Sequence, residues 1–421
     1  MTGTVAGGPG AEGSWPDRRG ADGAGAPGPS RCGTSDGSVP AADAAALAAE
    51  LVAIDSANPV LVPGGAGERA IAAHLAAWAR ASGLAASVID DPPGRPSVLV
   101  RGGRDRGGRR LLLCGHLDTV GYDGMTDPLT PRAEGGRLYG RGAYDMKGGL
   151  AAALVACRDA AAAGLDGQVI VAAVADEEHA SAGVQAVLPH VRADAAIVTE
   201  PTELDVAVAH KGFAWTEITV HGRAAHGSRP QLGTDAIRLA GLVLAELDAL
   251  DRELAARPPH PLLGHGSVHA TLISGGSGES TIAGQCTLTV ERRTLPGESA
   301  ATVEHEVASL LRRCGQRDPE FRASTRTLLA RDPFEIPAAD PLVAQMLAAA
   351  SQADGRPRQP AGLSYWADSA FLAAAGLPTV LFGPAGDGAH AETEWADMAS
   401  IETCSRVLTQ VTEDFCRLLP G

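Results

Sequence analysis

The stretch LLLCGHLDT at residues 111–119 decides the fold class, because a short apolar run there ends in glycine, histidine and aspartate. Three further runs have a similar form, namely VIVAAV at 169–174, AAIV at 195–198 and VLF at 380–382. Such runs are typical of strands buried on both faces of a mainly parallel sheet, and alanine-rich helical stretches separate them here. The sequence therefore predicts an α/β domain built around such a sheet.

Acids and histidines follow these apolar runs or open a glycine-rich turn. In open sheets of this kind, ligands gather outside the carboxyl ends of the strands. All five candidates are hard or borderline donors that suit zinc, manganese or cobalt. They are His116, Asp145, Glu178, Glu200 and His390. Together these residues predict a hydrolytic centre with two metal ions.

Each candidate also has a purely structural interpretation. His116 could form a hydrogen-bonded pair with Asp118, or bind a metal while the Asp118 carboxylate holds its other ring nitrogen. Asp145 could cap the helix predicted at 150–163, or bridge two ions ~3.5–4 Å apart. His390 could be a solvated loop residue. Only the joint pattern favours a metal centre over these separate interpretations.

Two adjacent acids, Glu177 and Glu178, come shortly after the run at 169–174. Like charges repel there unless a cation lies among them, although adjacent acids often simply face solvent. After a buried strand they can divide two tasks. Glu178 would coordinate a metal, and Glu177 would stay free to accept a proton from water. Glu200 occupies the matching end of the next predicted strand.

Composition limits the class of protein. A chain of 421 residues with 45% hydrophobic residues is long enough for two domains with their own cores. The formal net charge is −15 without a long basic run, so nucleic acid and anionic membranes are poor candidates as partners and small polar substrates remain. Seven widely spaced cysteines without a CxxC pair indicate reduced thiols. With no apolar membrane or signal segment, we expect a cytoplasmic protein.

The domain organisation follows from changes of pattern along the chain. Residues 1–39 are rich in glycine, alanine and proline and predict a disordered tail. Residues 40–212 and 330–421 carry the helix and buried-strand pattern of the catalytic domain, beginning with helices at 41–54 and 68–82. Residues 213–329 differ, and predict a ferredoxin-like α+β insertion. Its expected elements are a strand at 213–220, a helix at 234–256, strands at 268–273 and 285–293, a helix at 300–312 and a strand at 321–328.

With these motifs in place, the chain resembles a family of metal-dependent peptidases and deacylases. This family includes acetylornithine deacetylase, succinyl-diaminopimelate desuccinylase, aminoacylase and carboxypeptidase G. The resemblance spans about residues 41–419. It is carried by GHLDT at 115–119, DP at 127–128, GRG at 140–142, DMKGG at 145–149, EE at 177–178, EP at 200–201, and the segment from GP at 383–384 to the histidine at 390.

The resemblance implies a role for each candidate ligand. Asp145 would bridge both ions, His116 and Glu200 would complete one site, and Glu178 and His390 would complete the other. The implied ions are two divalent metals, zinc first, with cobalt or manganese as alternatives.

The resemblance also implies roles beyond the metal ligands. Glu177 would be the general base and acid, and residues 213–329 would form a lid and dimerisation module of a homodimer. His226, within GRAAHGS at 222–228, would polarise the scissile carbonyl, either in its own subunit or across the dimer interface.

Two lid residues are expected to bind substrate. Arg293, within ERRTLPG at 291–297, matches an arginine that would fork onto a substrate carboxylate, with simple surface exposure as the alternative. Ser280 stands where relatives commonly carry asparagine, and Ala283 where they carry proline. A hydroxyl offers fewer donors than an amide, so these differences bear on substrate identity.

The motifs HKGF at 210–213, AHGSRP at 225–230 and WADS at 366–369 are most similar to members like acetylornithine deacetylase. The expected function is therefore removal of an acyl group from an N-acyl amino acid. A dipeptidase or carboxypeptidase of the same family is the alternative. A third possibility is a non-catalytic binding relative, although such relatives lack part of the metal set and this chain has all of it.

Overall fold

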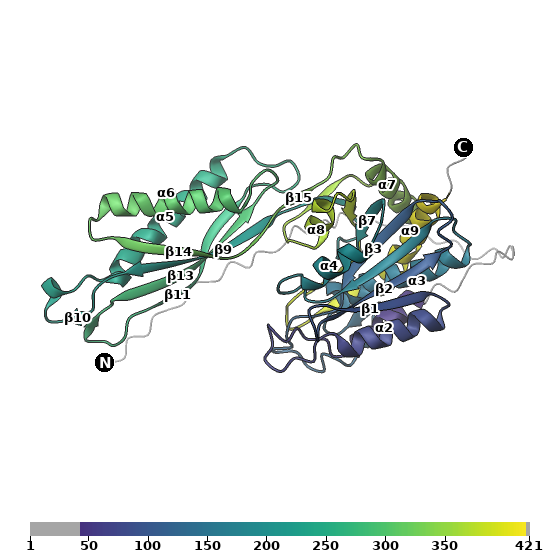
Figure 1. Ribbon diagram of the computed structural model, residues 1–421, viewed down its shortest axis with the longest axis horizontal. Coiled ribbons are helices and arrows are strands. Elements are labelled where there is room, and N and C mark those ends of the chain that lie inside the picture. The colour runs from purple at the N-terminus through teal and green to yellow at the C-terminus, as the bar shows by residue number, and fades with distance from the viewer. Residues whose placement is uncertain (1–42, 418–421) are drawn as a thin grey trace, which may run out of the picture. The chain divides into compact units, whose positions relative to one another are not determined.

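The computed structural model describes residues 43–417 (Figure 1). The tail predicted at 1–39 lies outside the described residues. The described part contains a large central sheet with helices packed against it, and a smaller sheet with two helices of its own.

The central sheet has nine strands. Eight follow the order β1-β2-β6-β3-β7-β17-β8-β15, and β16 pairs with β8 beside this path. The neighbours β6, β3, β7 and β17 are parallel, whereas the pairs toward both edges are largely antiparallel. The strands are β1 (Ala85–Asp90), β2 (Pro96–Gly103), β3 (Arg110–His116), β6 (Gln168–Val174), β7 (Ala195–Val198), β8 (Ala207–His210), β15 (Phe334–Glu335), β16 (Ala361–Leu363) and β17 (Thr379–Leu381).

The middle of this sheet is buried on both faces. In β3 every residue from Leu111 to His116 is buried, and in β6 every residue from Val169 to Val174. Because successive side chains point to opposite faces, a strand buried at every position has both faces covered. The prediction of a mainly parallel, buried sheet is confirmed.

Helices cover the central sheet (Figure 1). The alanine-rich α3 packs on α1 and α9 and on strands β2, β3 and β6. The helices are α1 (Asp43–Val52), α2 (Arg69–Ala81), α3 (Gly148–Ala162), α4 (Ala182–Val187), α7 (Pro341–Asp354), α8 (Ser369–Ala374) and α9 (Met398–Cys416), with short helical turns η1 (Ala143–Lys147) and η2 (Leu188–His190). A third helical turn, η3 (Pro230–Leu232), lies in the inserted domain. No helix in residues 43–417 is both long and apolar enough to cross a membrane.

A small antiparallel sheet, which the sequence patterns did not indicate, joins two distant parts of the catalytic domain. Its order is β18-β19-β5-β4. Strands β4 (Arg132–Glu134) and β5 (Arg137–Tyr139) precede the DMKGG motif, and β18 (Gly386–Asp387) and β19 (Trp395–Asp397) flank the loop that carries His390. Pairing of β5 with β19 therefore brings these two segments together.

The inserted domain has the predicted sequence of elements. Its four main strands are antiparallel in the order β11-β13-β9-β14, and two helices pack on the sheet (Figure 1). Connected as strand, helix, strand, strand, helix, strand, they form a ferredoxin-like fold. The elements are β9 (Gly212–His221), α5 (Ala236–Ala256), β11 (Ser267–Gly275), β13 (Gln285–Thr294), α6 (Ala300–Arg317) and β14 (Arg322–Arg331), with the short strands β10 (Ala225–His226) and β12 (Thr281–Ile282).

One helix of this domain is longer than predicted. The helix expected at 300–312 continues to Arg317, because Gly315 is tolerated inside it. It ends at Asp318, the residue before Pro319, where a following proline disfavours helical backbone. The last strand likewise reaches Arg331, two residues beyond the domain boundary expected at 329.

Candidate metal centre

Four of the candidate side chains lie at the same edge of the central sheet. His116 is the last residue of β3, Glu177 and Glu178 come shortly after β6, and Glu200 follows β7. These three strands are parallel neighbours, so their carboxyl ends meet at one edge.

Asp145 and His390 reach this edge from outside the strands. Asp145 lies in the turn η1, and its Oδ1 is 3.1 Å from Nε2 of His116. Its other oxygen, Oδ2, is 3.3 Å from Nε2 of His390. The carboxylate thus lies between two imidazoles with one oxygen toward each, which is the arrangement a bridging ligand needs. The helix-cap alternative for Asp145 is wrong, because α3 begins at Gly148 and Lys147 occupies its capping position.

Two overlapping groups of ligand atoms result. The ligand atoms of His116, Glu177 and Glu200 lie within 4.8 Å of one another, and so do those of His116, Asp145 and Glu178. Nε2 of His390 is 3.1 Å from Oε2 of Glu178. The structure therefore brings together all five predicted ligands and the predicted general base.

A buried oxygen in this cluster has no donor. Oε1 of Glu178 is buried and accepts no hydrogen bond from any described residue. Leaving a buried carboxylate oxygen unpaired costs free energy that a cation at this point would offset. The residues present, four carboxylates and two imidazoles, therefore fit two divalent cations.

The pKa values of the two histidines also indicate that the cluster favours positive charge. Burial disfavours the charged form of His116, but its hydrogen bond to Asp145 and the nearby Glu200 and Glu177 raise its pKa well above the usual value. Hydrogen bonds to Asp145 and Glu178 raise the pKa of His390 to about 10. The surrounding carboxylates therefore favour a positive charge at both imidazoles, and a bound metal ion would compete with protons for them.

Glu177, like Glu200, is a carboxylate with a raised pKa. Burial raises its pKa well above the usual value, and the carboxylates Glu200 and Asp368 act in the same direction, against the opposing influence of His116. A carboxylate with a raised pKa can both accept and return a proton near neutral pH.

Asp118 does not act through the group that the sequence suggested. The backbone oxygen of Asp118 is 2.8 Å from Nδ1 of His116, whereas its carboxylate is 3.8 Å away. That carboxylate instead accepts hydrogen bonds from the backbone N–H groups of Glu177 and Glu178, at 3.1 and 3.3 Å. The expectation that the Asp118 carboxylate orients His116 is therefore corrected. The carbonyl orients the imidazole, and the carboxylate holds the two glutamates.

A buried polar network behind the site was missed by sequence reasoning. Nδ2 of Asn58 donates to Asp118 and Asp176, at 2.7 and 3.1 Å. Arg95 pairs with Asp176 at 2.9 Å and with Glu68. These residues come from separate parts of the chain and form no motif, so nothing in the sequence pattern marked them. They support the loop that carries Glu177 and Glu178.

The structure also brings together two of the predicted lid residues. Strands β10 and β12 pair His226 with Thr281, and the N–H of Gly227 donates to the oxygen of Ser280 at 2.7 Å. Nδ1 of His226 is 2.8 Å from Oγ of Ser228 on an exposed loop. Among residues 43–417, no hydrogen bond or ion pair joins His226 or Ser280 to the metal cluster.

Arg293 has a partner within its own strand. It pairs with Glu291 at 2.8 Å, and its guanidinium lies 5.4 Å from the centre of the Phe213 ring. Glu291 also accepts from Nε1 of Trp215 at 3.2 Å. Arg293 is thus not a freely solvated surface residue, and a substrate carboxylate would have to replace Glu291 as its partner.

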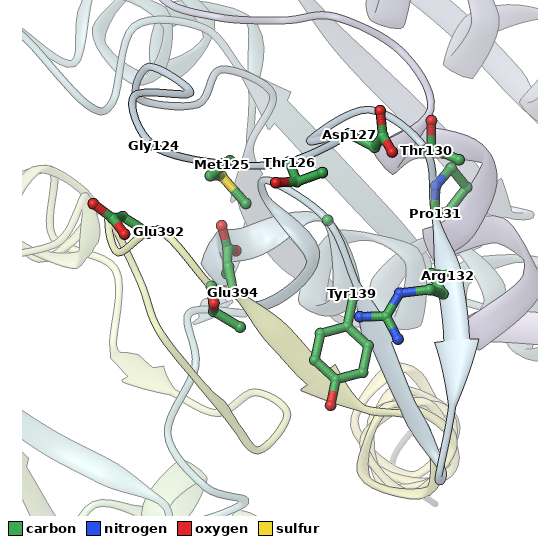
Figure 2. Close-up of a pocket in the computed structure, with 12 residues that line it drawn as sticks. Gly124, Met125, Thr126, Asp127, Thr130, Pro131, Arg132, Tyr139, Glu392 and Glu394 are labelled. Atoms are coloured by element: carbon green, nitrogen blue, oxygen red, sulfur yellow. The ribbon is translucent and has the colours of Figure 1, made fainter.

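A cavity of about 470 Å³ has Tyr139, Glu392 and Glu394 among its lining residues (Figure 2). Its walls come from the loop at 124–132, the end of β5 and the segment before β19. It is lined by Gly124, Met125, Thr126, Asp127, Thr130, Pro131, Arg132, Tyr139, Gly140, Glu392, Thr393 and Glu394. None of the predicted site residues lines it. Its link to the metal cluster is Glu394, whose carboxylate accepts hydrogen bonds from the Asp145 turn.

Comparison with known proteins identifies the family. Residues 112–414 match the model of peptidase family M20/M25/M40, so the chain belongs to this family. The chain is 32% identical to the acetylornithine deacetylase of Proteus mirabilis over 353 residues, which cover 81% of this chain and 89% of that protein. It is 33% identical to the acetylornithine deacetylase of Myxococcus xanthus over 331 residues, which cover 76% of this chain and 83% of the relative.

Solved structures share the fold at low sequence identity. A metallo-carboxypeptidase of the M20 family from Sulfolobus solfataricus has a TM-score of 0.71 at 17% identity, covering 88% of this chain and 98% of that one. A dinuclear metal-binding M20 peptidase from Bacillus subtilis has a TM-score of 0.67 at 15% identity, covering 89% and 97%.

Family and geometry together define the class of enzyme. The chain is a metal-dependent hydrolase of amide bonds, and its clustered carboxylates and imidazoles provide a site for divalent metal ions.

Proposed function

We propose that this chain removes the acyl group from an N-acyl amino acid, as an acetylornithine deacetylase does. Hydrolysis is supported above all by one observation, the Asp145 carboxylate placed between the His116 and His390 imidazoles at 3.1 and 3.3 Å. The deacylase assignment is supported by relatives of that name, which are similar over more than three quarters of the chain.

In this proposal Asp145 would be shared by two ions. His116 and Glu200 would complete one site, and Glu178 and His390 would complete the other. Imidazole nitrogens and carboxylate oxygens suit zinc best, with cobalt and manganese as alternatives. When bound, such ions lower the pKa of a coordinated water toward ~7 and polarise the carbonyl under attack.

The protein side chains supply the proton transfers and the orientation of the substrate. Glu177 takes a proton from the attacking water and delivers it to the nitrogen of the departing amine, for which its raised pKa suits it. His226 donates a hydrogen bond to the carbonyl oxygen as negative charge develops there. Arg293 exchanges Glu291 for the substrate carboxylate, and Ser280, close to His226, offers a hydroxyl to the acyl group.

The inserted domain also has the features of a dimerisation surface. Strand β11 lies at one edge of its sheet, and Leu272 and Ile273 on it are 69% and 57% exposed. An edge strand with exposed apolar side chains is a ready surface for pairing with a second chain. We therefore propose a homodimer, in which His226 acts in its own subunit or across the interface.

The test is an assay of purified protein, loaded in turn with zinc, cobalt and manganese, against N-acetyl amino acids and dipeptides. Release of acetate at a higher kcat/KM than cleavage of any dipeptide supports the deacylase. The reverse ranking supports a dipeptidase or carboxypeptidase. Absence of metal-dependent hydrolysis, with less than a full complement of metal, would indicate a binding protein.

A further inference from the structure

Glu394 is a buried acid that the mechanism above does not use. The residue is only 1% exposed, yet its carboxylate accepts four hydrogen bonds from one short turn. Oε1 accepts from the N–H groups of Tyr144 and Asp145, at 2.9 and 3.0 Å. Oε2 accepts from the N–H of Gly142 at 2.9 Å and from Nη1 of Arg141 at 2.8 Å. A single side chain thus fixes the backbone that presents Asp145.

Arg141 connects the same turn to the loop that carries His390. It is 2% exposed, and each of its three guanidinium nitrogens has a partner. Besides Glu394, it donates from Nη2 to the oxygen of Ala391 at 3.0 Å and from Nε to the oxygen of Gly121 at 2.9 Å. Ala391 is the residue next to His390. Arg141 and Glu394, which we call the clasp, therefore hold both Asp145 and His390.

The two proposed ion sites depend on the clasp to different extents. His116 ends strand β3 and Glu200 follows strand β7, and His116 is held further by the carbonyl of Asp118. His390 lies on a loop with its side chain 54% exposed, and among the described residues its ring is joined only to Asp145 and Glu178. The position of His390 therefore depends on the contacts that hold its loop, such as the hydrogen bond from Arg141 to Ala391.

We infer that the Arg141–Glu394 clasp is the positioning device for the second ion site, the one formed by Asp145, Glu178 and His390. It fixes the Asp145 carboxylate and the His390 loop to each other, so that binding of the second ion needs little rearrangement. This inference rests on the proposed metal centre, and it adds two residues that touch neither ion nor substrate. Partners of this kind change metal affinity roughly 10–100-fold when removed.

A merely structural ion pair would behave differently. If the clasp only stabilised the domain, its loss would lower the unfolding temperature and weaken both ion sites to similar extents. If the clasp positions the second site, its loss weakens that site more than the first, although Asp145 belongs to both. The relative affinities of the two ions in one protein therefore separate the two roles.

The experiment titrates metal-free protein with cobalt(II), following each binding step by calorimetry and by visible absorption. The variant is Glu394→Gln, which keeps the shape of the side chain but turns one acceptor oxygen into a donor facing backbone N–H groups. Glu392→Gln is the matched control, because Glu392 is an exposed acid two residues away in the same segment. We expect Glu394→Gln to weaken the second ion about 10–100-fold and the first ion several-fold less, because His116 and Glu200 hold the first ion from the central sheet, and we expect the control to bind both normally.

Equal affinities in Glu394→Gln and wild type, or equal weakening of both ions, would overturn the inference. Should Glu394→Gln fail to fold, Arg141→Lys serves instead, because it keeps the charge but carries its donors on a single nitrogen, which cannot reach Ala391, Gly121 and Glu394 together. The same selective loss is expected from it, and an unchanged second ion would count against the clasp. Wild-type protein that binds no cobalt would refute the proposed metal centre itself.

Discussion

Replacement of Gly149 by alanine tests whether the first turn of α3 must touch the end of β7. A Cβ atom on Gly149 would lie 1.9 Å from the backbone oxygen of Thr199 and 3.0 Å from its carbon. Both partners are backbone atoms, so no side chain can turn away. The helix and the strand end would have to separate by more than about 1 Å to restore an ordinary contact.

That displacement would act directly on the metal centre. Thr199 adjoins Glu200, and Gly149 lies four residues after Asp145, so the shift would change the distance between two ligands of the first ion. A misplacement of ~1 Å in a catalytic geometry costs on the order of 100-fold in rate. Inserting an atom into a packed site also costs about 1–3 kcal/mol of stability. We therefore expect Gly149→Ala to lose about 100-fold in kcat/KM and to unfold at a lower temperature.

Gly241→Ala is the control. Gly241 is also helical, within α5, but nothing lies within 4 Å of the added Cβ. The change should leave activity unaltered and stabilise the protein by about 0.5–1 kcal/mol. Initial rates with saturating metal, together with thermal unfolding, measure both effects. Activity of Gly149→Ala within threefold of wild type would show that the metal centre does not depend on this close approach of α3 to Thr199.

Three further predictions concern separate parts of the molecule. Glu177→Gln should lower turnover by about 10²–10⁴-fold while the protein keeps its metal, and a variant that still turns over substrate would remove Glu177 from the mechanism. Burial lowers the pKa of His210 from 6.5 to about 4, so the unfolded chain binds a proton that the folded chain rejects. The free energy of unfolding should therefore fall by about 3 kcal/mol as the pH drops from 6.5 to 4. In His210→Gln, the free energy of unfolding should depend less steeply on pH over this range. Leu272→Lys should weaken the proposed dimer, as measured by light scattering; an unchanged mass would place the interface elsewhere.

The central sheet could be predicted because its signals are local. The apolar runs at 111–114 and 169–174 are each buried in one strand, and the rule that ligands gather at the carboxyl ends of parallel strands brought His116, Glu178 and Glu200 together. The small sheet could not be predicted. Its strands have two or three residues, too few for a periodic pattern, and they form only because residues near 138 meet residues near 396.

The prediction for Asp118 was wrong because it depended on which atom of the residue contacts His116. Asp118 was found from its spacing to His116, but spacing does not distinguish its carbonyl from its carboxylate. Glu394 gave no signal, because all four of its donors lie about 250 residues earlier in the chain. The pairing of Arg293 with Glu291 could have been predicted from the sequence, because the two residues are two positions apart and side chains at that spacing share one face of a strand.

The most direct test of the two-ion centre is diffraction from crystals grown with zinc, with anomalous scattering recorded at the zinc absorption edge. We expect two peaks about 3.5–4 Å apart, one touching His116 and Glu200, the other touching Glu178 and His390, with Asp145 between them. A single peak, or zinc bound away from these five side chains, would rule out the two-ion centre.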